Sequence, residues 1–201
     1  MDEKRDIVKR GYESCAQGYS ATRDQFRNER FLNDLANRLP ASAHVLDLGC
    51  GSGKPVDAFL LDKGFAVTGI DISEEQIRRA KEALPRGIFV QGDMSEAEFP
   101  NESFDAVISF YAIFHIPREE HAALLKNAWN VLRPGGYILV TMGAGEWEGT
   151  EEDFHGTEMF WSHYGREKNL ELIREAGFAV LSEEIDSSGD ERHLVVLAQK
   201  Q

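Results

Sequence analysis

Val45-Leu46-Asp47-Leu48-Gly49-Cys50-Gly51-Ser52-Gly53 is the most informative segment of the chain. Its first half is a short apolar run that predicts a buried strand, and its second half places a glycine at every second position. A turn without side chains lets the backbone approach a ligand closely and exposes N–H groups where the next helix begins. The segment therefore predicts a site for a nucleotide-like cofactor.

The spacing of these glycines argues against two common phosphate-binding motifs. A dinucleotide fingerprint, G-x-G-x-x-G, needs a third glycine at position 54 or 56, where Lys54 and Val56 stand. A phosphate loop, G-x-x-x-x-G-K-[ST], needs glycine at position 48 and a hydroxyl at position 55, where Leu48 and Pro55 stand. The pattern that remains, D-x-G-x-G-x-G, covers residues 47–53.

Further segments follow at the spacing of alternating strands and helices. They are Val67–Ser73, Gln91–Met94, Phe104–Phe110 and Leu132–Val140. Together with residues 47–53 they resemble, in order, the motifs of the class I S-adenosylmethionine-dependent methyltransferases, over roughly residues 44–142. The resemblance implies S-adenosylmethionine as the cofactor and S-adenosylhomocysteine as its product.

The resemblance also assigns residues to the cofactor. Asp71, at the end of the second strand, is expected to accept hydrogen bonds from the ribose hydroxyls. Its alternative role is that of a helix N-terminal aspartate beside Ser73. Asp93 is expected to bind the adenine amino group, although a Gly-Asp pair also suits a plain turn. Other expected cofactor residues are Tyr19, Asp47, Gly49, Cys50, Gly51, Gly53, Ile72, Gln76, Met94 and Phe110.

The hydrophobic pattern predicts an α/β fold with a single doubly wound, mostly parallel, seven-stranded sheet and helices on both faces. Strands are expected at 44–49, 66–71, 88–92, 104–110, 136–142, 178–186 and 192–199. Helices are expected at 54–63, 74–83, 118–131 and 166–176. Residues 187–190 are too short for a helical crossover, so the last strand is expected to be antiparallel. In the family that strand lies between the fifth and sixth.

We expect residues 1–201 to form a single domain. Residues 1–40 would be an N-terminal helical lid, with a break between two helices near Gly11 and Gly18, and residues 41–142 the cofactor-binding core. Residues 143–165, which have no helical or strand period, would be a substrate loop whose aromatic residues either form an acceptor pocket or pack over the sheet end. Residues 166–201 would be a C-terminal helix and β-hairpin.

The net charge of −13, from 22 basic and 35 acidic residues, disfavours nucleic acid as a partner. The chain has no apolar run of membrane-spanning length and no signal peptide, so we expect a cytoplasmic protein without membrane contact. Cys15 and Cys50 provide neither a disulfide framework nor metal-ligand spacing, and we expect no metal site. A monomer and a homodimer are both compatible with the sequence.

Three histidines are candidates for a catalytic base. His115 follows the fourth strand and is the best placed, while a packing role ahead of Pro117 is the alternative. His155 and His163, in the segment 143–165, are rivals. From the resemblance and from a compact chain with no added recognition domain, we expect methyl transfer to an oxygen or nitrogen of a small-molecule acceptor. The alternatives are a protein methyltransferase and a non-catalytic S-adenosylmethionine-binding module.

Overall fold

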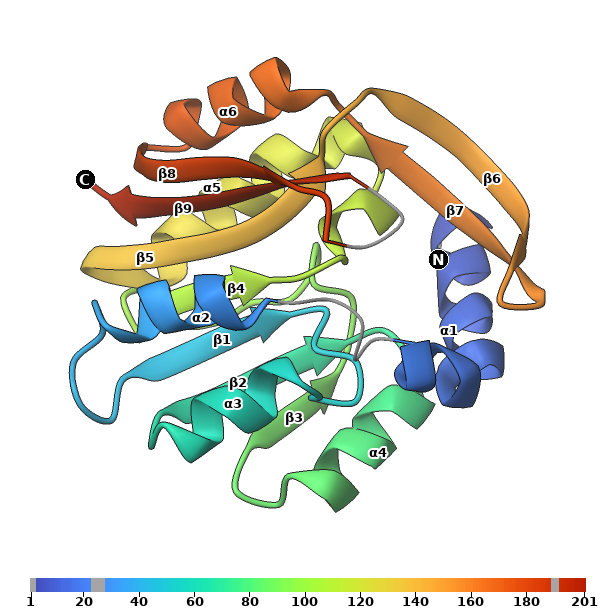
Figure 1. Ribbon diagram of the computed structural model, residues 1–201, viewed down its shortest axis with the longest axis horizontal. Coiled ribbons are helices and arrows are strands. Elements are labelled where there is room, and N and C mark those ends of the chain that lie inside the picture. The colour runs from blue at the N-terminus through green and yellow to red at the C-terminus, as the bar shows by residue number, and fades with distance from the viewer. Residues whose placement is uncertain (1–2, 23–27, 189–191) are drawn as a thin grey trace.

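A seven-stranded sheet runs through the centre of the computed structural model, which describes residues 3–22, 28–188 and 192–201, with no side-chain description for residues 16–22 (Figure 1). The strand order is β3-β2-β1-β4-β5-β9-β8. The strands are β1 (His44–Leu48), β2 (Ala66–Asp71), β3 (Ile88–Gln91), β4 (Phe104–Ser109), β5 (Leu132–Gly143), β8 (Phe178–Asp186) and β9 (His193–Lys200). The first five are parallel, whereas β9 is antiparallel to both β5 and β8. The predicted fold class is confirmed, including the place of the last strand.

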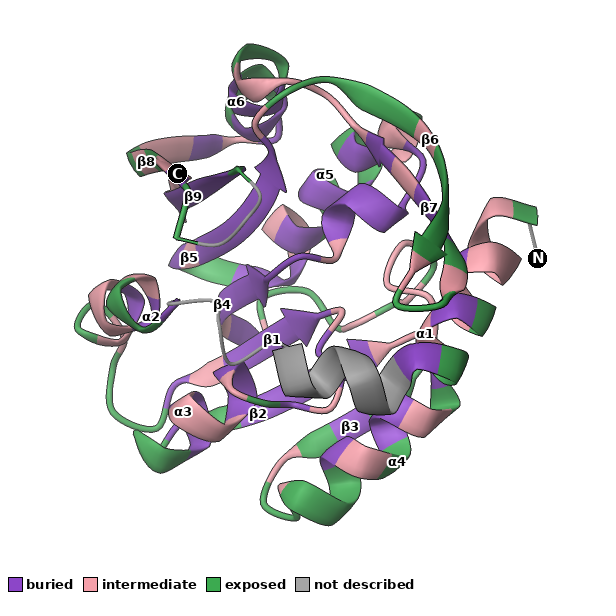
Figure 2. Ribbon diagram, turned by 45° about the vertical axis from the view of Figure 1, so that its right-hand side comes forward, coloured by how far each residue is buried: buried purple, intermediate pink, exposed green. Residues whose placement is uncertain are grey.

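Helices cover both faces of the sheet (Figure 2). They are α1 (Glu3–Thr22), α2 (Glu29–Ala36), α3 (Val56–Asp62), α4 (Glu74–Ala83), α5 (His121–Val131) and α6 (Arg166–Glu175), with the short 3-10 helices η2 (Ile113–His115) and η3 (Arg118–Glu120). Because side chains alternate along a strand, Leu46 packs with α5 and α6 on one face, whereas Val45 packs with α2 and α3 on the other. Burial on both faces explains why the central strands are apolar throughout.

Helix α1 is continuous, so the predicted break near Gly11 and Gly18 is wrong. Gly11 serves close packing instead. A Cβ atom at this position would lie 2.7 Å from Cε of Met159 and 3.0 Å from the carbonyl oxygen of Glu158, both on strand β7. The missing side chain therefore lets α1 approach β7 (Thr157–His163), and this contact offsets the low helix propensity of glycine.

The segment 143–165 is not the irregular loop that we predicted. It forms an antiparallel hairpin of β6 (Trp147–Phe154) and β7, which rises beside α1 (Figure 1). His155 and Gly156 have φ angles of 52° and 82°, which are typical of a two-residue hairpin turn. The acidic β6 has little strand propensity of its own. It is a strand because β7, anchored by the buried Met159 and Phe160, provides its pairing partner.

Two predicted boundaries also shift. The predicted helix 118–131 begins as the 3-10 turn η3 and becomes α-helical only at His121. The predicted strand 136–142 begins earlier, at Leu132, so that Pro134, Gly135 and Gly136, residue types typical of turns, lie inside β5. Gly135 has a φ of 75°, and the pairing of β4 with β5 shifts register there. The turn residues therefore make a bulge in a longer strand. Of the helices that the structure describes, none is long and apolar enough to cross a membrane.

His121, at the start of α5, is fully buried. One ring nitrogen, Nε2, lies 3.1 Å from the carbonyl oxygen of Ile116 and donates to it, while Nδ1 has no hydrogen-bond partner among the described residues. Burial disfavours the charged ring and lowers the pKa of His121 from 6.5 to about 4, against the smaller opposing effect of the neighbouring carbonyl groups. The folded protein therefore keeps this histidine neutral.

We expect His121 to make the protein less stable in weak acid. The unfolded chain takes up a proton on this histidine below pH 6.5, but the folded chain does so only below about pH 4. The contribution of the neutral His121 to the free energy of unfolding is complete above pH 6.5 and is lost as the pH falls toward 4. Between pH 7.5 and 4.5, urea unfolding should show the wild type losing on the order of 3 kcal/mol more than His121→Gln. This expectation would be contradicted if the free energy of unfolding changed with pH by the same amount in the wild type and in His121→Gln.

Candidate cofactor site

Two adjoining cavities lie at the carboxyl ends of β1, β2 and β3, where open α/β sheets bind ligands. We call them together the strand-end groove. The larger has a volume of about 490 Å³ and the smaller about 260 Å³, and they share Tyr12, Gly49, Asp71 and Ala112. The larger also exposes Arg5, Val8, Ile70, Ile72, Gly92, Asp93, Met94, His115 and Ile116, and the smaller Gly51, Gln76 and Tyr111.

The glycine loop forms the floor of the groove. Gly49, Gly51 and Gly53 all have positive φ angles, of 80°, 55° and 75°. At Gly49 a Cβ atom would lie only 2.2 Å from Cβ of Ala112, the residue after Tyr111 at the end of β4. Both conformation and space therefore require glycine at position 49, where the methyl group of Ala112 packs against the backbone of the glycine loop.

Asp71 holds the glycine loop against β2. Its Oδ2 accepts a hydrogen bond from the backbone N–H of Gly51 at 2.8 Å, and its Oδ1 accepts one from the N–H of Ser73 at 2.9 Å. The second contact agrees with the alternative interpretation, a carboxylate at the start of α4. Asp71 lines both cavities as well, so one side chain combines both roles.

Gln76, on the first turn of α4, carries an unsatisfied polar atom. Its backbone N–H donates to Ser73 Oγ at 3.3 Å, so Ser73 caps the start of α4. Its side chain is 1% exposed, and Oε1 has no hydrogen-bond donor among the described residues. Buried acceptors of this kind are normally paired. Because Gln76 lines the smaller cavity, a ligand hydroxyl or ammonium group there would supply the missing donor.

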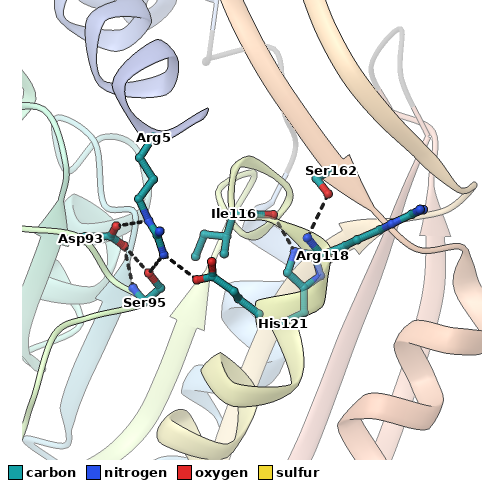
Figure 3. A network of polar contacts seen from close by, with 8 residues as sticks. Arg5, Asp93, Ser95, Ile116, Arg118, His121 and Ser162 are labelled. Atoms are coloured by element: carbon teal, nitrogen blue, oxygen red, sulfur yellow. Dashed lines mark hydrogen bonds and ion pairs between the residues drawn. The ribbon is translucent and has the colours of Figure 1, made fainter. Parts of the chain in front are cut away.

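Asp93 is tied to helix α1 (Figure 3). Its Oδ1 accepts hydrogen bonds from Ser95, from N–H at 2.8 Å and from Oγ at 2.7 Å, and its Oδ2 lies 2.6 Å from Nε of Arg5. Arg5 also pairs with Glu120 at 2.5 Å. Burial works to lower the pKa of Arg5, but the charges of Asp93 and Glu120 outweigh it and raise the pKa. A permanently charged Arg5 therefore fastens α1 at the rim of the groove.

His115 and Tyr12 form a hydrogen-bonded pair at the wall of the groove. His115 is 5% exposed, and its Nδ1 lies 2.8 Å from the carbonyl oxygen of Phe160. A carbonyl can only accept, so Nδ1 carries the ring proton and Nε2 of the neutral ring is left as the acceptor. The hydroxyl of Tyr12 lies 2.7 Å from Nε2 and donates to it. The pair therefore joins α1, η2 and β7.

The other two histidines lie elsewhere. His155 occupies the tip of the hairpin turn and is not among the residues that line the groove. His163 lines a separate cavity at the carboxyl end of β5, and its Nδ1 donates to the carbonyl oxygen of Gly145 at 2.8 Å. Only His115 of the three candidates therefore borders the groove.

The structure divides the predicted cofactor residues into two groups. Those that line the groove are Gly49, Gly51, Asp71, Ile72, Gln76, Asp93 and Met94. Those that lie beneath or beside it are Asp47, Cys50, Gly53 and Phe110, of which Cys50 packs against Gly69 and α4. The side chain of Tyr19 is outside the described residues. The contact of these residues with a cofactor stays a prediction. The absence of a metal site also stays a prediction, although no metal-ligand cluster occurs among the described residues.

Arg5, Val8 and Ile116 also line the groove, although no sequence motif points to them. Arg5 and Val8 lie on α1, three positions apart, and Tyr12 follows four positions later. This spacing puts the three on one face of the helix, which is the signal that could have identified them.

Known proteins of similar sequence are methyltransferases. A family model described as "Methyltransferase domain" matches residues 45–136. A putative methyltransferase of Encephalitozoon cuniculi is 30% identical over 96% of this chain and 95% of its own length. The 27-O-demethylrifamycin SV methyltransferase of Amycolatopsis mediterranei is 34% identical over 66% of this chain. The chain spans only 54% of that protein and 32% of a cyanobacterial 2-methyl-6-phytyl-1,4-hydroquinone methyltransferase, from Synechocystis.

Two solved structures are similar over most of the chain. A SAM-dependent methyltransferase of Methanosarcina mazei has a TM-score of 0.71 and 25% identity, covering 82% of this chain and 95% of its own. The 1,6-didemethyltoxoflavin-N1-methyltransferase of Burkholderia thailandensis has a TM-score of 0.80 over 99% of this chain and 89% of its own. Its identity is 21%, so that likeness concerns the fold alone.

Proposed function

Because this chain belongs to the class I S-adenosylmethionine-dependent methyltransferases, we propose that it transfers a methyl group from S-adenosylmethionine to an oxygen or nitrogen of a small-molecule acceptor. The observation that carries the proposal is the strand-end groove, which brings Asp71 and the glycine loop together. The relatives' names support a small-molecule acceptor, since they include a rifamycin derivative and a hydroquinone.

The groove fits S-adenosylmethionine in its donor and acceptor groups. Asp71 would accept hydrogen bonds from the ribose hydroxyls, and Asp93 would face the adenine amino group between Ile72 and Met94. Oε1 of Gln76, which lacks a donor among the described residues, would take one from the ribose or the methionine ammonium. Gly49 and Gly51 line the groove without side chains, so a ligand there would lie close to their backbone.

When bound, S-adenosylmethionine would supply an activated methyl group on a sulfonium centre. The chain's contribution is positioning, exclusion of water and proton removal. Helix α1, fastened by Arg5, would close the groove toward solvent. Nε2 of His115 would receive the proton of Tyr12 while the Tyr12 oxygen takes the proton of the acceptor.

We also propose what kind of acceptor the protein excludes, where it is located, and how it is organised. The net charge of −13 supports an acceptor other than nucleic acid. We also propose that it is a cytoplasmic monomer or homodimer, in which residues 1–40 act as the lid of a single domain. A protein substrate and a non-catalytic, S-adenosylmethionine-sensing role are the competing functions.

Titration calorimetry should detect binding of S-adenosylmethionine with a dissociation constant between about 1 µM and 1 mM. Release of S-adenosylhomocysteine, measured over a panel of phenols, amines and carboxylic acids, should then identify an acceptor. No heat of binding at millimolar cofactor would contradict the proposal. Binding without turnover on any panel member, together with turnover on a protein extract, would favour the protein methyltransferase.

A further inference from the structure

A third cavity, of about 600 Å³, lies at the carboxyl end of β5, beside the β6–β7 hairpin. We call it the β5-end cavity. Trp147, Trp161 and Phe114 form its aromatic walls. The indole of Trp147 is 44% exposed, which is unusual for so large an apolar side chain, whereas Phe114 is buried. The cavity therefore presents aromatic surface to whatever enters it.

Ring contacts hold these walls in place. The ring of Phe114 stacks on His193 at 5.5 Å with an interplanar angle of 27°, and it meets Trp161 at 5.3 Å. Trp147 in turn lies 6.5 Å from the ring of His163. Because the rings support one another, the walls exist without a ligand, and a flat molecule could enter with little rearrangement.

Rings that line the β5-end cavity contact rings that line the strand-end groove. His115 lines the groove, and its ring centre is 4.4 Å from that of Trp161 and 5.2 Å from that of Phe114, which both line the β5-end cavity. Tyr111 lines the groove and meets His193 of the cavity at 4.9 Å. The β5-end cavity thus lies next to the Tyr12–His115 pair, whereas Asp71 and Asp93 follow β2 and β3, on the other side of β1 and β4 in the strand order.

The polar side chains that line the cavity are mostly basic, whereas the chain as a whole has a net charge of −13. Arg192, His163 and His193 supply three nitrogen-bearing side chains, and Glu151 is the one carboxylate among the described lining residues. His163 is held in place, since Nδ1 donates to Gly145 and a Cβ atom at Gly143 would lie 2.2 Å from that nitrogen. In the neutral ring, Nε2 is then the acceptor.

We infer that the β5-end cavity binds the methyl acceptor and that this acceptor is a flat aromatic or heteroaromatic molecule with a ring hydroxyl or N–H group. The inference rests on the proposed function and narrows its substrate class. Indole and phenyl walls select a flat ring. Arg192 and the acceptor nitrogen of His163 favour an additional polar group on it, distinct from the hydroxyl or N–H group whose proton the Tyr12 oxygen would take.

The probes are 2-naphthol and its saturated counterpart decahydro-2-naphthol, added to protein that is saturated with S-adenosylhomocysteine. Saturation-transfer NMR should show 2-naphthol binding about tenfold more tightly than decahydro-2-naphthol, because only the aromatic ring gains stacking contacts. Trp147→Leu should weaken 2-naphthol binding about fivefold. Val90→Ala, an equally exposed (44%) apolar residue on β3 at the far edge of the sheet, should leave it unchanged.

Affinity for S-adenosylhomocysteine, measured by calorimetry, separates this inference from the proposed function. Trp147→Leu should bind S-adenosylhomocysteine as the wild type does, and its circular dichroism spectrum should be unchanged. Equal binding of the two naphthols, or equal binding of 2-naphthol by Trp147→Leu and wild type, would contradict the binding of an aromatic acceptor in the β5-end cavity. The proposed function would be unaffected. Failure of the wild type to bind S-adenosylhomocysteine would overturn the proposed function instead.

Discussion

Asp71→Ala is expected to weaken the binding of S-adenosylhomocysteine by about 100-fold while the protein stays folded. Each hydrogen bond from a hydroxyl to a charged carboxylate contributes about 1.5–3 kcal/mol. Loss of two such bonds, at the lower end of that range, is about 3 kcal/mol, or about two powers of ten in the dissociation constant. Titration calorimetry measures it, and Asp62→Ala, at the exposed end of α3, is the matched control.

Asp71 also supports the glycine loop, since it accepts the N–H of Gly51. Loss of affinity alone would not separate ribose recognition from a loosened loop. Adenosine and 2′,3′-dideoxyadenosine make the separation, because they differ only in the hydroxyls. The wild type should prefer adenosine, and Asp71→Ala should bind both nucleosides equally. If the wild type does not distinguish them, Asp71 acts on the loop and the ribose assignment is wrong.

The sheet could be predicted from the sequence because its signals are local. The apolar run that contains Leu46, the turn glycines and the acid at the end of β2 each depend on residues close in the chain. The antiparallel pairing of β9 with β8 followed from a short connection, because so few residues allow only an antiparallel return. The place of β9 between β5 and β8 was implied by the family resemblance. The groove residues Gly49 and Asp71 were predictable for the same reason.

The hairpin and the contacts of α1 were not predictable in this way. Strand β6 is acidic and exposed, so its conformation depends on pairing with β7 and not on its own residues. Gly11 suggested a helix break because the residue that requires a glycine there, Met159 on β7, lies far along the chain. A local pattern therefore does not show that this glycine serves packing. The ion pair of Arg5 with Asp93 likewise joins residues 88 positions apart, beyond the reach of any periodic pattern.

Tyr12 and His115 lie 103 positions apart in the sequence, and loss of the Tyr12 hydroxyl is expected to slow methyl transfer. Tyr12→Phe keeps the ring that meets His115 edge-on at 5.2 Å, but it removes the hydroxyl that would pass the proton. Turnover should therefore fall by about 10²–10⁴-fold, with the dissociation constant of S-adenosylmethionine unchanged. The rate of S-adenosylhomocysteine release measures it, on whichever acceptor the panel identifies.

His115→Asn tests the other half of the pair. The asparagine amide can still donate to the carbonyl oxygen of Phe160, but it offers no acceptor at the position of Nε2. Because the two side chains would act as one unit, the double variant should be no slower than either single variant. Additive losses would mean that Tyr12 and His115 act separately.

A structural role for the pair makes a different prediction, and acceptor acidity distinguishes the two. If Tyr12 only packs α1 against His115, then Tyr12→Phe should slow all acceptors by the same factor. If the pair removes a proton, acceptors that are already ionised at the assay pH need no base. Variants of the identified acceptor that carry electron-withdrawing substituents should then regain most of the lost rate with Tyr12→Phe, and a uniform loss would assign the pair to packing.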